Sequence, residues 1–496
     1  MKTLIRLFLF LGVLASSITA AAPPNIVIIF IDDMGYGDIG PYGATKQKTP
    51  NLDRMASEGM KLTSFYAAPV CSVSRAQLLT GCYGPRIDVP GVYGPGGASG
   101  LNPNEHTIAE RLKESGYATM CIGKWHVGDQ PEFLPTRQGF DHYYGFPYSN
   151  DMQRKSTESG LAVMPLLRDD KVVEFLTDDQ QSTIVKRYTD EAVRFITENK
   201  DKPFLLYLPH TAIHTPIHPG AAFREKSGNG QVGDWIEEID WSAGRVLDTL
   251  RDLKLAENTL VIFTSDNGPW LIKGADSGSA GPLRGGKGST WEGGMRVPTI
   301  AWWPGKIEPN SKEDAVAGTI DLLPTAVALA GGTVPDQPVI DGRDISPILL
   351  GKTQTSQRDA HYYFSGYQLQ AVRQGPWKLA LVPQNESMGQ PAKPDAANKT
   401  PRLYNLDAEI GEQTNVADAH PDIVVKLTSL ADKMIAEIGG SKPTARRPAG
   451  KVENPKTLHP SEDRKPSAKD KKGSSAKSVG ELGFWQVSKC VIKRSL

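Results

Sequence analysis

Four short runs of consecutive apolar residues are the clearest pattern in the chain, and each has the length of one β-strand. The runs are NIVIIFI (25–31), ATMCIG (118–123), FLLYL (204–208) and TLVIFT (259–264). They are apolar without alternation, which is typical of strands buried on both faces of a parallel sheet. Amphipathic stretches between them predict helices at 106–116, 180–200 and 233–255. Strands that alternate with helices predict an α/β sandwich with a large, mostly parallel central sheet.

The pattern changes at about residue 340. HYYFS, QAVRQGPWKLALV and PRLYNL predict shorter strands joined by turns, and residues 421–439 predict one helix. We therefore expect a large α/β domain at 23–340 and a smaller C-terminal α+β subdomain with an antiparallel sheet at 341–440. Residues 441–496 form a basic tail, whose Lys-, Pro- and Ser-rich composition predicts disorder. The final stretch, ELGFWQVSKCVIKRSL, is either an unstructured end or a short docking segment.

The first 22 residues have the pattern of a signal peptide. Lys2 and Arg6 precede the apolar run LFLFLGVLA, and small residues follow as far as Ala22. The run is too short to cross a bilayer, so a cleavable leader is favoured over a membrane anchor. We expect an exported protein, periplasmic or secreted, and no later run predicts a transmembrane segment.

Composition and charge limit the classes of partner. With 496 residues, of which 39% are hydrophobic, the chain is long enough for a large core. The formal net charge is zero, but residues 441–477 carry 11 Lys and Arg against four Asp and Glu, so the body before them is acidic. An acidic body argues against nucleic acid as a partner. The basic tail is either a solvated linker or a segment that holds an acidic glycan or the cell envelope.

Polar residues follow each of the four apolar runs at once. These are Asp32 and Asp33, then Lys124 and His126, then His210 and His214, and finally Asp266 and Asn267. In open α/β sheets, ligands bind outside the carboxyl ends of the strands. We therefore expect these groups to converge on one edge of the sheet.

The acidic pairs predict a metal site. Asp32, Asp33, Asp266 and Asn267 offer only oxygen ligands, which favour Ca²⁺, and less so Mg²⁺, over Zn²⁺. Carboxylates side by side would repel one another without a cation among them. Each pair alone is equally well explained as a turn or a helix N-cap.

The basic and nucleophilic candidates point to an anionic ester. Lys124 and His126 are two residues apart, so they can point the same way, bind an anion and move a proton, although a surface lysine and a capping histidine fit equally well. Lys287 lies in the glycine-rich stretch GPLRGGKGSTWEGGMRVP, which lacks the spacing of a nucleotide-binding P-loop. Cys71 is half of a disulfide with Cys82, a buried filler, a nucleophile, or the precursor of a modified residue.

Together these stretches resemble the type I, formylglycine-dependent sulfatases of the alkaline phosphatase superfamily, and most of all the branch of arylsulfatase A and N-acetylgalactosamine-6-sulfatase. The resemblance covers roughly residues 25–440. It rests on IVIIFIDDMGYGDIGPYG, CSVSRAQLLTG, GKWHVG, LPTRQGFDHYYGFPYSND, SDNG and LRGGKGSTWEGGMRVPTIAWWPG. It implies an alkaline-phosphatase-like α/β/α sandwich and a sulfuric ester hydrolase that acts on a sulfated carbohydrate or polysaccharide.

The resemblance also implies roles for the candidate residues. A maturation enzyme would oxidise Cys71 to formylglycine, whose hydrate attacks sulfur, and Arg75 would steady it. Ca²⁺ would be held by Asp32, Asp33, Asp266, Asn267 and the modified Cys71. Sulfate oxygens would contact Lys124, Lys287 and Ser149, while His126 would help to expel sulfate and His214 would protonate the leaving oxygen.

The chain departs from the family pattern C-x-P-x-R at one position, where Val73 replaces proline. Valine also favours an extended conformation, though less rigidly than proline, so we expect maturation to occur. Two alternatives remain open. One is a phosphodiesterase or phosphonate monoester hydrolase of the same superfamily, and the other is a sulfoglycan-binding homologue with an unmodified Cys71.

Overall fold

The computed structural model describes residues 22–156, 159–392 and 401–459. Its centre is an 11-stranded mixed sheet with the strand order β13-β2-β12-β11-β1-β10-β5-β6-β8-β7, to which β9 adds by pairing with β8. The four predicted strands are confirmed as β1 (Asn25–Ile31), β5 (Ala118–Ile122), β10 (Phe204–Pro209) and β11 (Thr259–Ser265). They are neighbours in the order β11-β1-β10-β5, and all three pairings are parallel.

The outer strands of the large sheet add antiparallel pairings to this parallel centre. β12 runs antiparallel to β11 and β2, and β8 runs antiparallel to β6, β7 and β9. Their bounds are β2 (Met60–Leu62), β6 (His142–Gly145), β7 (Arg154–Lys155), β8 (Ala162–Arg168), β9 (Lys171–Thr177), β12 (Ile300–Trp302) and β13 (Ser311–Glu313).

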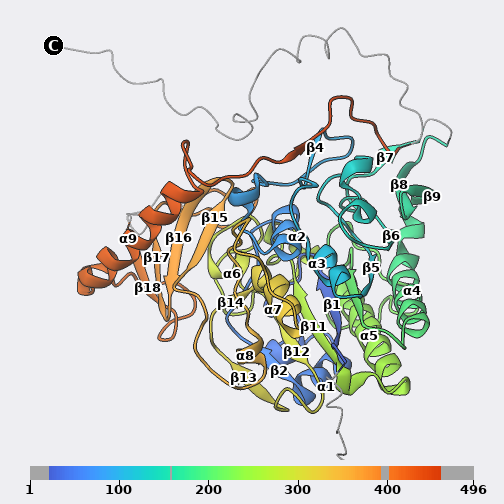
Figure 1. Cartoon of the computed structure of the whole chain (residues 1–496), viewed down its shortest axis with the longest axis horizontal. Coiled ribbons are helices and arrows are strands. Elements are labelled where there is room, and N and C mark those ends of the chain that lie inside the picture. Colours follow the sequence, from blue (N-terminus) through green and yellow to red (C-terminus); the bar gives the residue numbers. More distant parts are fainter. Residues whose placement is uncertain (1–21, 157–158, 393–400, 460–496) are drawn as a thin grey trace, which may run out of the picture.

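Two separate cores cover the two faces of the sheet. Successive residues of β1 alternate between them, because side chains along a strand point to opposite faces: Ile26 and Ile28 belong to one core, and Val27 and Ile29 to the other. Three helices contribute to the first core, α2 (Cys71–Thr80), α3 (Ile108–Glu114) and α7 (Leu322–Leu329). The second core lies under α1 (Pro50–Glu58), α4 (Ile184–Glu198) and α5 (Gly230–Asp252). The predicted α/β/α sandwich is therefore confirmed, and Figure 1 shows its layers.

The C-terminal subdomain is an antiparallel sheet with one long helix, as expected. The strands β15 (His361–Ser365), β16 (Gln368–Gln374), β17 (Trp377–Ala380) and β18 (Arg402–Asn405) pair in chain order. Helix α9 (Pro421–Glu437) packs against this sheet, at the left of Figure 1.

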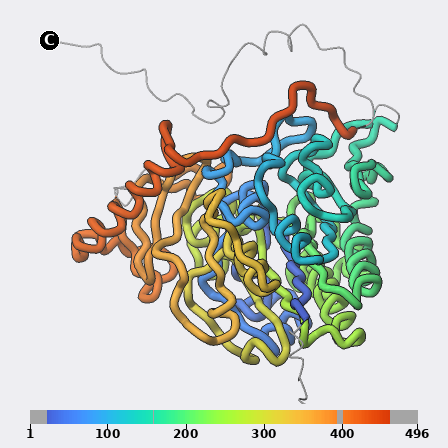
Figure 2. The backbone as a smooth tube through the Cα atoms, in the orientation of Figure 1, coloured from blue at the N-terminus to red at the C-terminus, as the bar shows by residue number. Residues whose placement is uncertain are grey.

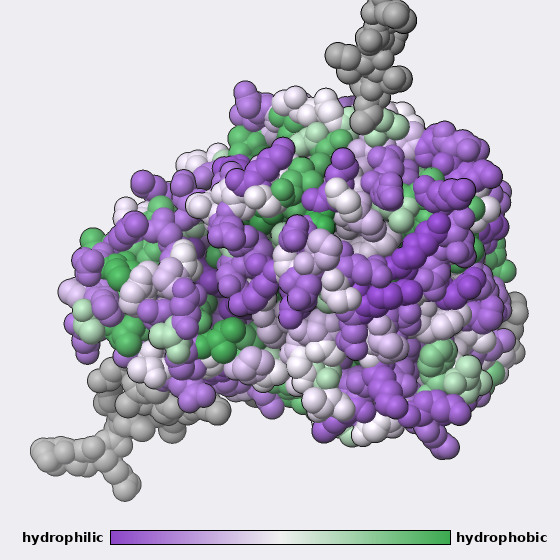
Figure 3. All heavy atoms as spheres, turned by 90° about the horizontal axis from the view of Figure 1, so that it is seen from below, coloured by the Kyte–Doolittle hydropathy of each residue, from purple (hydrophilic) through white to green (hydrophobic). Residues whose placement is uncertain are grey.

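The space-filling view shows a mostly hydrophilic surface on which apolar residues form small groups (Figure 3).

The prediction of disorder is wrong for the first part of the basic tail. Residues 441–459 run along the large domain, and β19 (Gly450–Lys451) pairs with β4 (Ser99–Gly100). Figure 2 shows this red segment passing over the top of the molecule. Arg447 forms an ion pair with Glu105. Composition mispredicted this segment because the large domain supplies the partners that its own sequence lacks. Residues 1–21 of the predicted signal peptide and residues 460–496 lie outside the described residues.

Among the described residues, the structure contains no helix that combines the length and the hydrophobicity needed to span a lipid bilayer.

Candidate active site

The side chains predicted to converge at the carboxyl ends of the strands do so, with the exception of His210. Asp32 and Asp33 follow β1, and Asp266 and Asn267 follow the adjacent strand β11. The backbone N–H of Asp33 donates to Asp266 Oδ1 (3.2 Å), and Asn267 Nδ2 donates to Asp33 Oδ1 (2.7 Å). All four side chains are buried. Residues more than 230 positions apart therefore form one acidic cluster.

Helix α2 brings Cys71 and Arg75 to this cluster. Cys71 is the first residue of the helix, and its sulfur, one oxygen of Asp32 and one of Asp266 lie within 4.8 Å of one another. The fully buried guanidinium of Arg75 donates to Asp266 Oδ2 (2.9 Å) and to the carbonyl oxygen of Lys124 (2.7 Å). Arg75 thus fixes the Asp266 side chain after β11 and the backbone of Lys124 after β5.

Two buried lysines compensate the acidic charge. Lys124 Nζ donates to Asp32 Oδ2 and to Ser149 Oγ, and Lys287 Nζ lies 2.7 Å from Asp33 Oδ1. Burial opposes ionisation of Asp32, but Lys124 and the other nearby cations outweigh it and hold the pKa of that carboxyl far below its ordinary value. Burial and the Asp32 charge raise the pKa of Asp266 to about 7.

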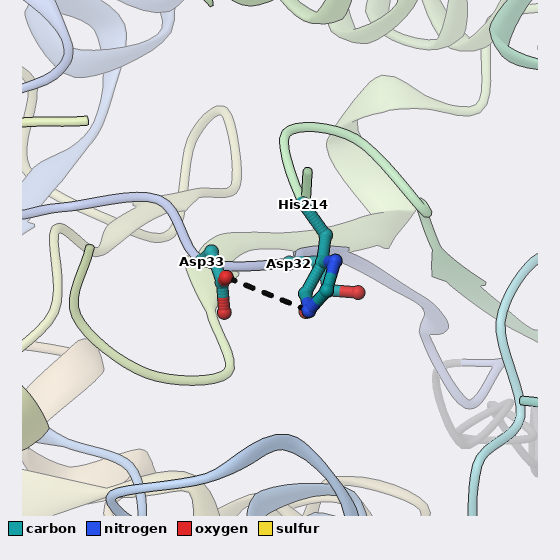
Figure 4. A group of neighbouring side chains, drawn as sticks. All are labelled: Asp32, Asp33 and His214. Carbon is teal, nitrogen blue, oxygen red and sulfur yellow. Dashed lines mark ion pairs between the residues drawn. The ribbon is translucent and has the colours of Figure 1, made fainter. Parts of the chain in front are cut away.

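The cluster suits a hard divalent cation. Asp32 Oδ1 and Asn267 Oδ1 are buried and have no hydrogen-bond partner among the described residues, although each is an acceptor. Unpartnered buried oxygens are costly unless a cation or donor satisfies them. Ligand atoms of Asp32, Asp33 and His214 also lie within 4.8 Å of one another, and Figure 4 shows the His214 ring beside both carboxylates. An oxygen-dominated set of this kind fits Ca²⁺ better than Zn²⁺.

A hydrogen bond to the backbone carbonyl of Tyr93 determines which ring nitrogen of His126 is free. His126 adopts φ 63°, and its Nε2 lies 2.9 Å from the carbonyl oxygen of Tyr93. A carbonyl only accepts, so Nε2 carries the proton and Nδ1 keeps its lone pair. Burial, with Lys124 and Arg75 nearby, puts the pKa of His126 well below 6.5. His126 is therefore a neutral group that can accept a proton at Nδ1, which has no partner among the described residues.

His214 has the opposite tautomer in its neutral form. Its Nδ1 donates to the carbonyl oxygen of Thr215 (2.6 Å), and its Nε2 lies 3.7 Å from Asp33 Oδ2. Burial and the positive charge of Lys287 lower its pKa, while Asp33 opposes that shift. Asn150 Nδ2 donates to the carbonyl oxygen of His214 (3.2 Å) and holds this loop in place.

His210 takes no part in this cluster. Its Nε2 faces the hydroxyl of Ser242 on α5 at 3.2 Å, and burial lowers its pKa to about 3. His210 and His214, the two histidines of the HTAIH stretch, therefore face different parts of the structure, and His214 alone of the two contacts the acidic cluster.

Sequence reasoning missed two residues near the site, Asn150 and Trp270. Lys287 Nζ lies over the face of the Trp270 indole, 4.7 Å from the centroid of the ring. Its place two residues after SDNG, in SDNGPW, was the available signal.

Residues 24–332 match the family described as Sulfatase, and residues 356–456 match the C-terminal region of aryl-sulfatase. Among curated proteins, human (Homo sapiens) arylsulfatase A is 38% identical over 84% of this chain and 89% of its own length. N-acetylgalactosamine-6-sulfatase of the dog (Canis lupus familiaris) is 40% identical over 72% of each chain.

Solved structures give the same result. The PsFucS1 sulfatase from Pseudoalteromonas sp. superposes with a TM-score of 0.76 at 30% identity, over 84% of this chain and 90% of that one. Ps i-CgsB in complex with k-i-k-neocarrahexaose gives a TM-score of 0.72 at 29% identity, over 86% and 95%.

Proposed function

The chain belongs to the sulfatase family and is a sulfuric ester hydrolase, and we propose that it acts on sulfate esters of carbohydrates after export, with formylglycine made from Cys71 and with Ca²⁺. The resemblance seen in the sequence is confirmed at the level of the family. The observation that carries the proposal is the cluster of Asp32, Asp33, Asp266 and Asn267 around Cys71, with two lysines beside it.

The names of relatives support a carbohydrate substrate. One curated relative is a sulfatase of N-acetylgalactosamine 6-sulfate by name, and one similar structure holds a neocarrahexaose. The pattern of the first 22 residues supports export.

The environment of Cys71 supports modification over direct use of the thiol. Burial raises the pKa of the Cys71 thiol, and Lys124 and Lys287 only partly oppose this. A thiol that keeps its proton is a poor nucleophile. Formylglycine would instead supply a hydroxyl of its hydrated aldehyde as the nucleophile, and the aldehyde would be regenerated when sulfate leaves.

A bound Ca²⁺ would stabilise negative charge on the nucleophile and on the sulfate oxygens. Asp32, Asp33, Asp266 and Asn267 are the residues that would hold it, together with the modified Cys71. Arg75 keeps Asp266 and the carbonyl of Lys124 in position for this role.

The remaining residues divide the work of binding and proton transfer. Lys124, Lys287 and the Ser149 hydroxyl bind the sulfate oxygens, where fixed cations stabilise the growing charge. His214 in its protonated form donates from Nε2 to the leaving oxygen, while the carbonyl of Thr215 keeps the ring oriented. His126, neutral with a free Nδ1, accepts a proton as sulfate departs.

The proposal is tested by coexpression with a formylglycine-generating enzyme, followed by mass spectrometry of the peptide that contains Cys71. The expected result is the mass decrease that accompanies conversion of CH₂–SH to CHO, together with Ca²⁺-dependent release of sulfate from a panel of sulfated sugars. Cys71→Ser is the control, because it removes the thiol that the maturation enzyme would oxidise. A thiol that persists under conditions that convert a control sulfatase would favour the sulfoglycan-binding alternative. Modified protein that cleaves only phosphate or phosphonate esters would favour the other hydrolases of the superfamily.

A further inference from the structure

Apolar side chains gather at the edge of the otherwise charged site. Leu271 and Ile272, which directly follow Trp270, are 36% and 44% exposed, and Met388 on the facing loop is 38% exposed. The Trp270 indole nitrogen donates to the Met388 carbonyl oxygen at 3.3 Å, which joins the two loops. We call these four residues the apolar rim. Exposed apolar groups that cluster at a site, and are not scattered singly, indicate a binding surface.

Trp270 connects the apolar rim to the charged centre. Its ring lies over Lys287 Nζ at 4.7 Å, and its centroid is 5.7 Å from that of the His214 ring. The backbone N–H of Lys287 also donates to the carbonyl oxygen of Pro269 (2.8 Å). This hydrogen bond holds the loop of Lys287 against the loop of Trp270 beside the indole ring. A cation over the face of an indole is attracted by the negative face of the ring, which helps to fix its plane.

This position coincides with the path of the leaving group. In the proposed function Lys287 binds a sulfate oxygen and His214 protonates the leaving oxygen. The carbon attached to that oxygen must therefore lie next to these two residues. The indole contacts both of them, so the ring of the alcohol meets Trp270 as it leaves the charged centre.

We infer that Trp270 is a specificity-determining residue on which the sugar ring that bears the sulfate stacks. The inference rests on the proposed function and adds the surface that recognises the alcohol. A pyranose has an apolar C–H face and a polar edge, which matches an indole beside charged groups. Lys273 Nζ lies 4.1 Å from the centroid of the same ring and belongs to an exposed residue. Its long side chain can swing aside to admit a sugar.

The test compares Trp270→Ala and Trp270→Phe with the unmodified chain, each matured on Cys71 and loaded with Ca²⁺. Trp377→Ala is the matched control, because Trp377 is a half-buried tryptophan on the C-terminal sheet. The measured quantities are kcat and KM for the best substrate among sulfated galactose, fucose and N-acetylgalactosamine monosaccharides, and for an aryl sulfate. The inhibition constant of inorganic sulfate serves as a probe without a ring.

We expect Trp270→Ala to raise KM for the sulfated sugar about tenfold, which is a typical loss for an aromatic contact of this kind. Trp270→Phe should keep a KM close to that of the unmodified chain. The inhibition constant of sulfate should be the same in all variants, and Trp377→Ala should leave KM for the sulfated sugar unchanged. An unchanged KM, an equal rise in the sulfate inhibition constant, or a loss confined to the aryl ester would overturn the inference. Failure of the unmodified chain to cleave any sulfate ester would instead count against the proposed function.

Discussion

Replacing Lys287 by methionine tests the charge balance of the site most directly. Methionine keeps the unbranched shape and most of the length of the side chain, and it removes the ammonium group with its charge and its hydrogen-bond donors. Lys287 Nζ lies 2.7 Å from Asp33 Oδ1, and their side chains are 2% and 5% exposed. At this distance Coulomb's law with an effective dielectric constant of about 20 gives an attraction of about 6 kcal/mol. Because desolvation offsets part of it, removing one partner of such a buried pair costs about 3–5 kcal/mol.

The same variant should behave differently once Ca²⁺ is bound. If Asp33 is a ligand, excess Ca²⁺ compensates the carboxylate that Lys287 leaves behind, so most of the stability loss seen in EDTA should disappear. Activity should still fall about 100- to 1000-fold, because a fixed cation at the sulfate oxygens is gone. Urea unfolding in EDTA and in Ca²⁺, together with a sulfate-release assay, measures both effects.

Lys378→Met is the matched control for this experiment. Lys378 is also a fully buried lysine, 3.0 Å from Glu292 and 2.7 Å from Glu412, but it belongs to strand β17 of the C-terminal sheet. Its loss should destabilise the protein equally with and without Ca²⁺. If Lys287→Met shows the same Ca²⁺-independent loss as Lys378→Met, Asp33 does not bind the ion and the reasoning is refuted.

Three further predictions concern stability, maturation and the C-terminal segment. Burial raises the pKa of Glu238 from 4.5 to about 7, so the folded state keeps a proton that the unfolded state releases, and the free energy of unfolding falls as pH rises through this window. Glu238→Gln should flatten that fall, and parallel stability curves from pH titration of urea unfolding would contradict it. Val73→Pro, in the first turn of α2 where proline is tolerated, should raise the fraction of Cys71 converted, as read by mass spectrometry, and an equal fraction would show that valine is no handicap. Arg447→Ala, which removes both hydrogen bonds to Glu105, should cost about 1–3 kcal/mol and speed proteolysis within 441–459, whereas an unchanged cleavage rate would mean that the other contacts of this segment hold it without the ion pair.

Local patterns along the chain are enough to predict the central strands and the edge of the sheet at which the candidate site lies. Runs such as NIVIIFI are apolar at every position, and only a strand covered on both faces can bury them all. Because Asp32 and Asp266 follow such runs directly, parallel pairing had to bring them to the same edge. These conclusions depend on local patterns and on one topological rule, and both can be read along the chain.

The pairing of the buried charges and the choice of histidines that face the site could not be predicted in this way, because both depend on contacts made in the folded chain. Asp33 is compensated by Lys287, 254 residues later, and this depends on strand order and loop path, which no local pattern records. His210 and His214 are four residues apart in the sequence, yet His210 faces α5 and His214 faces Asp33. The tautomer of His126 follows from a carbonyl group at Tyr93, and the order of residues 441–459 follows from partners in the large domain. In each case the deciding contact joins distant segments, so its partner exists only after the chain has folded.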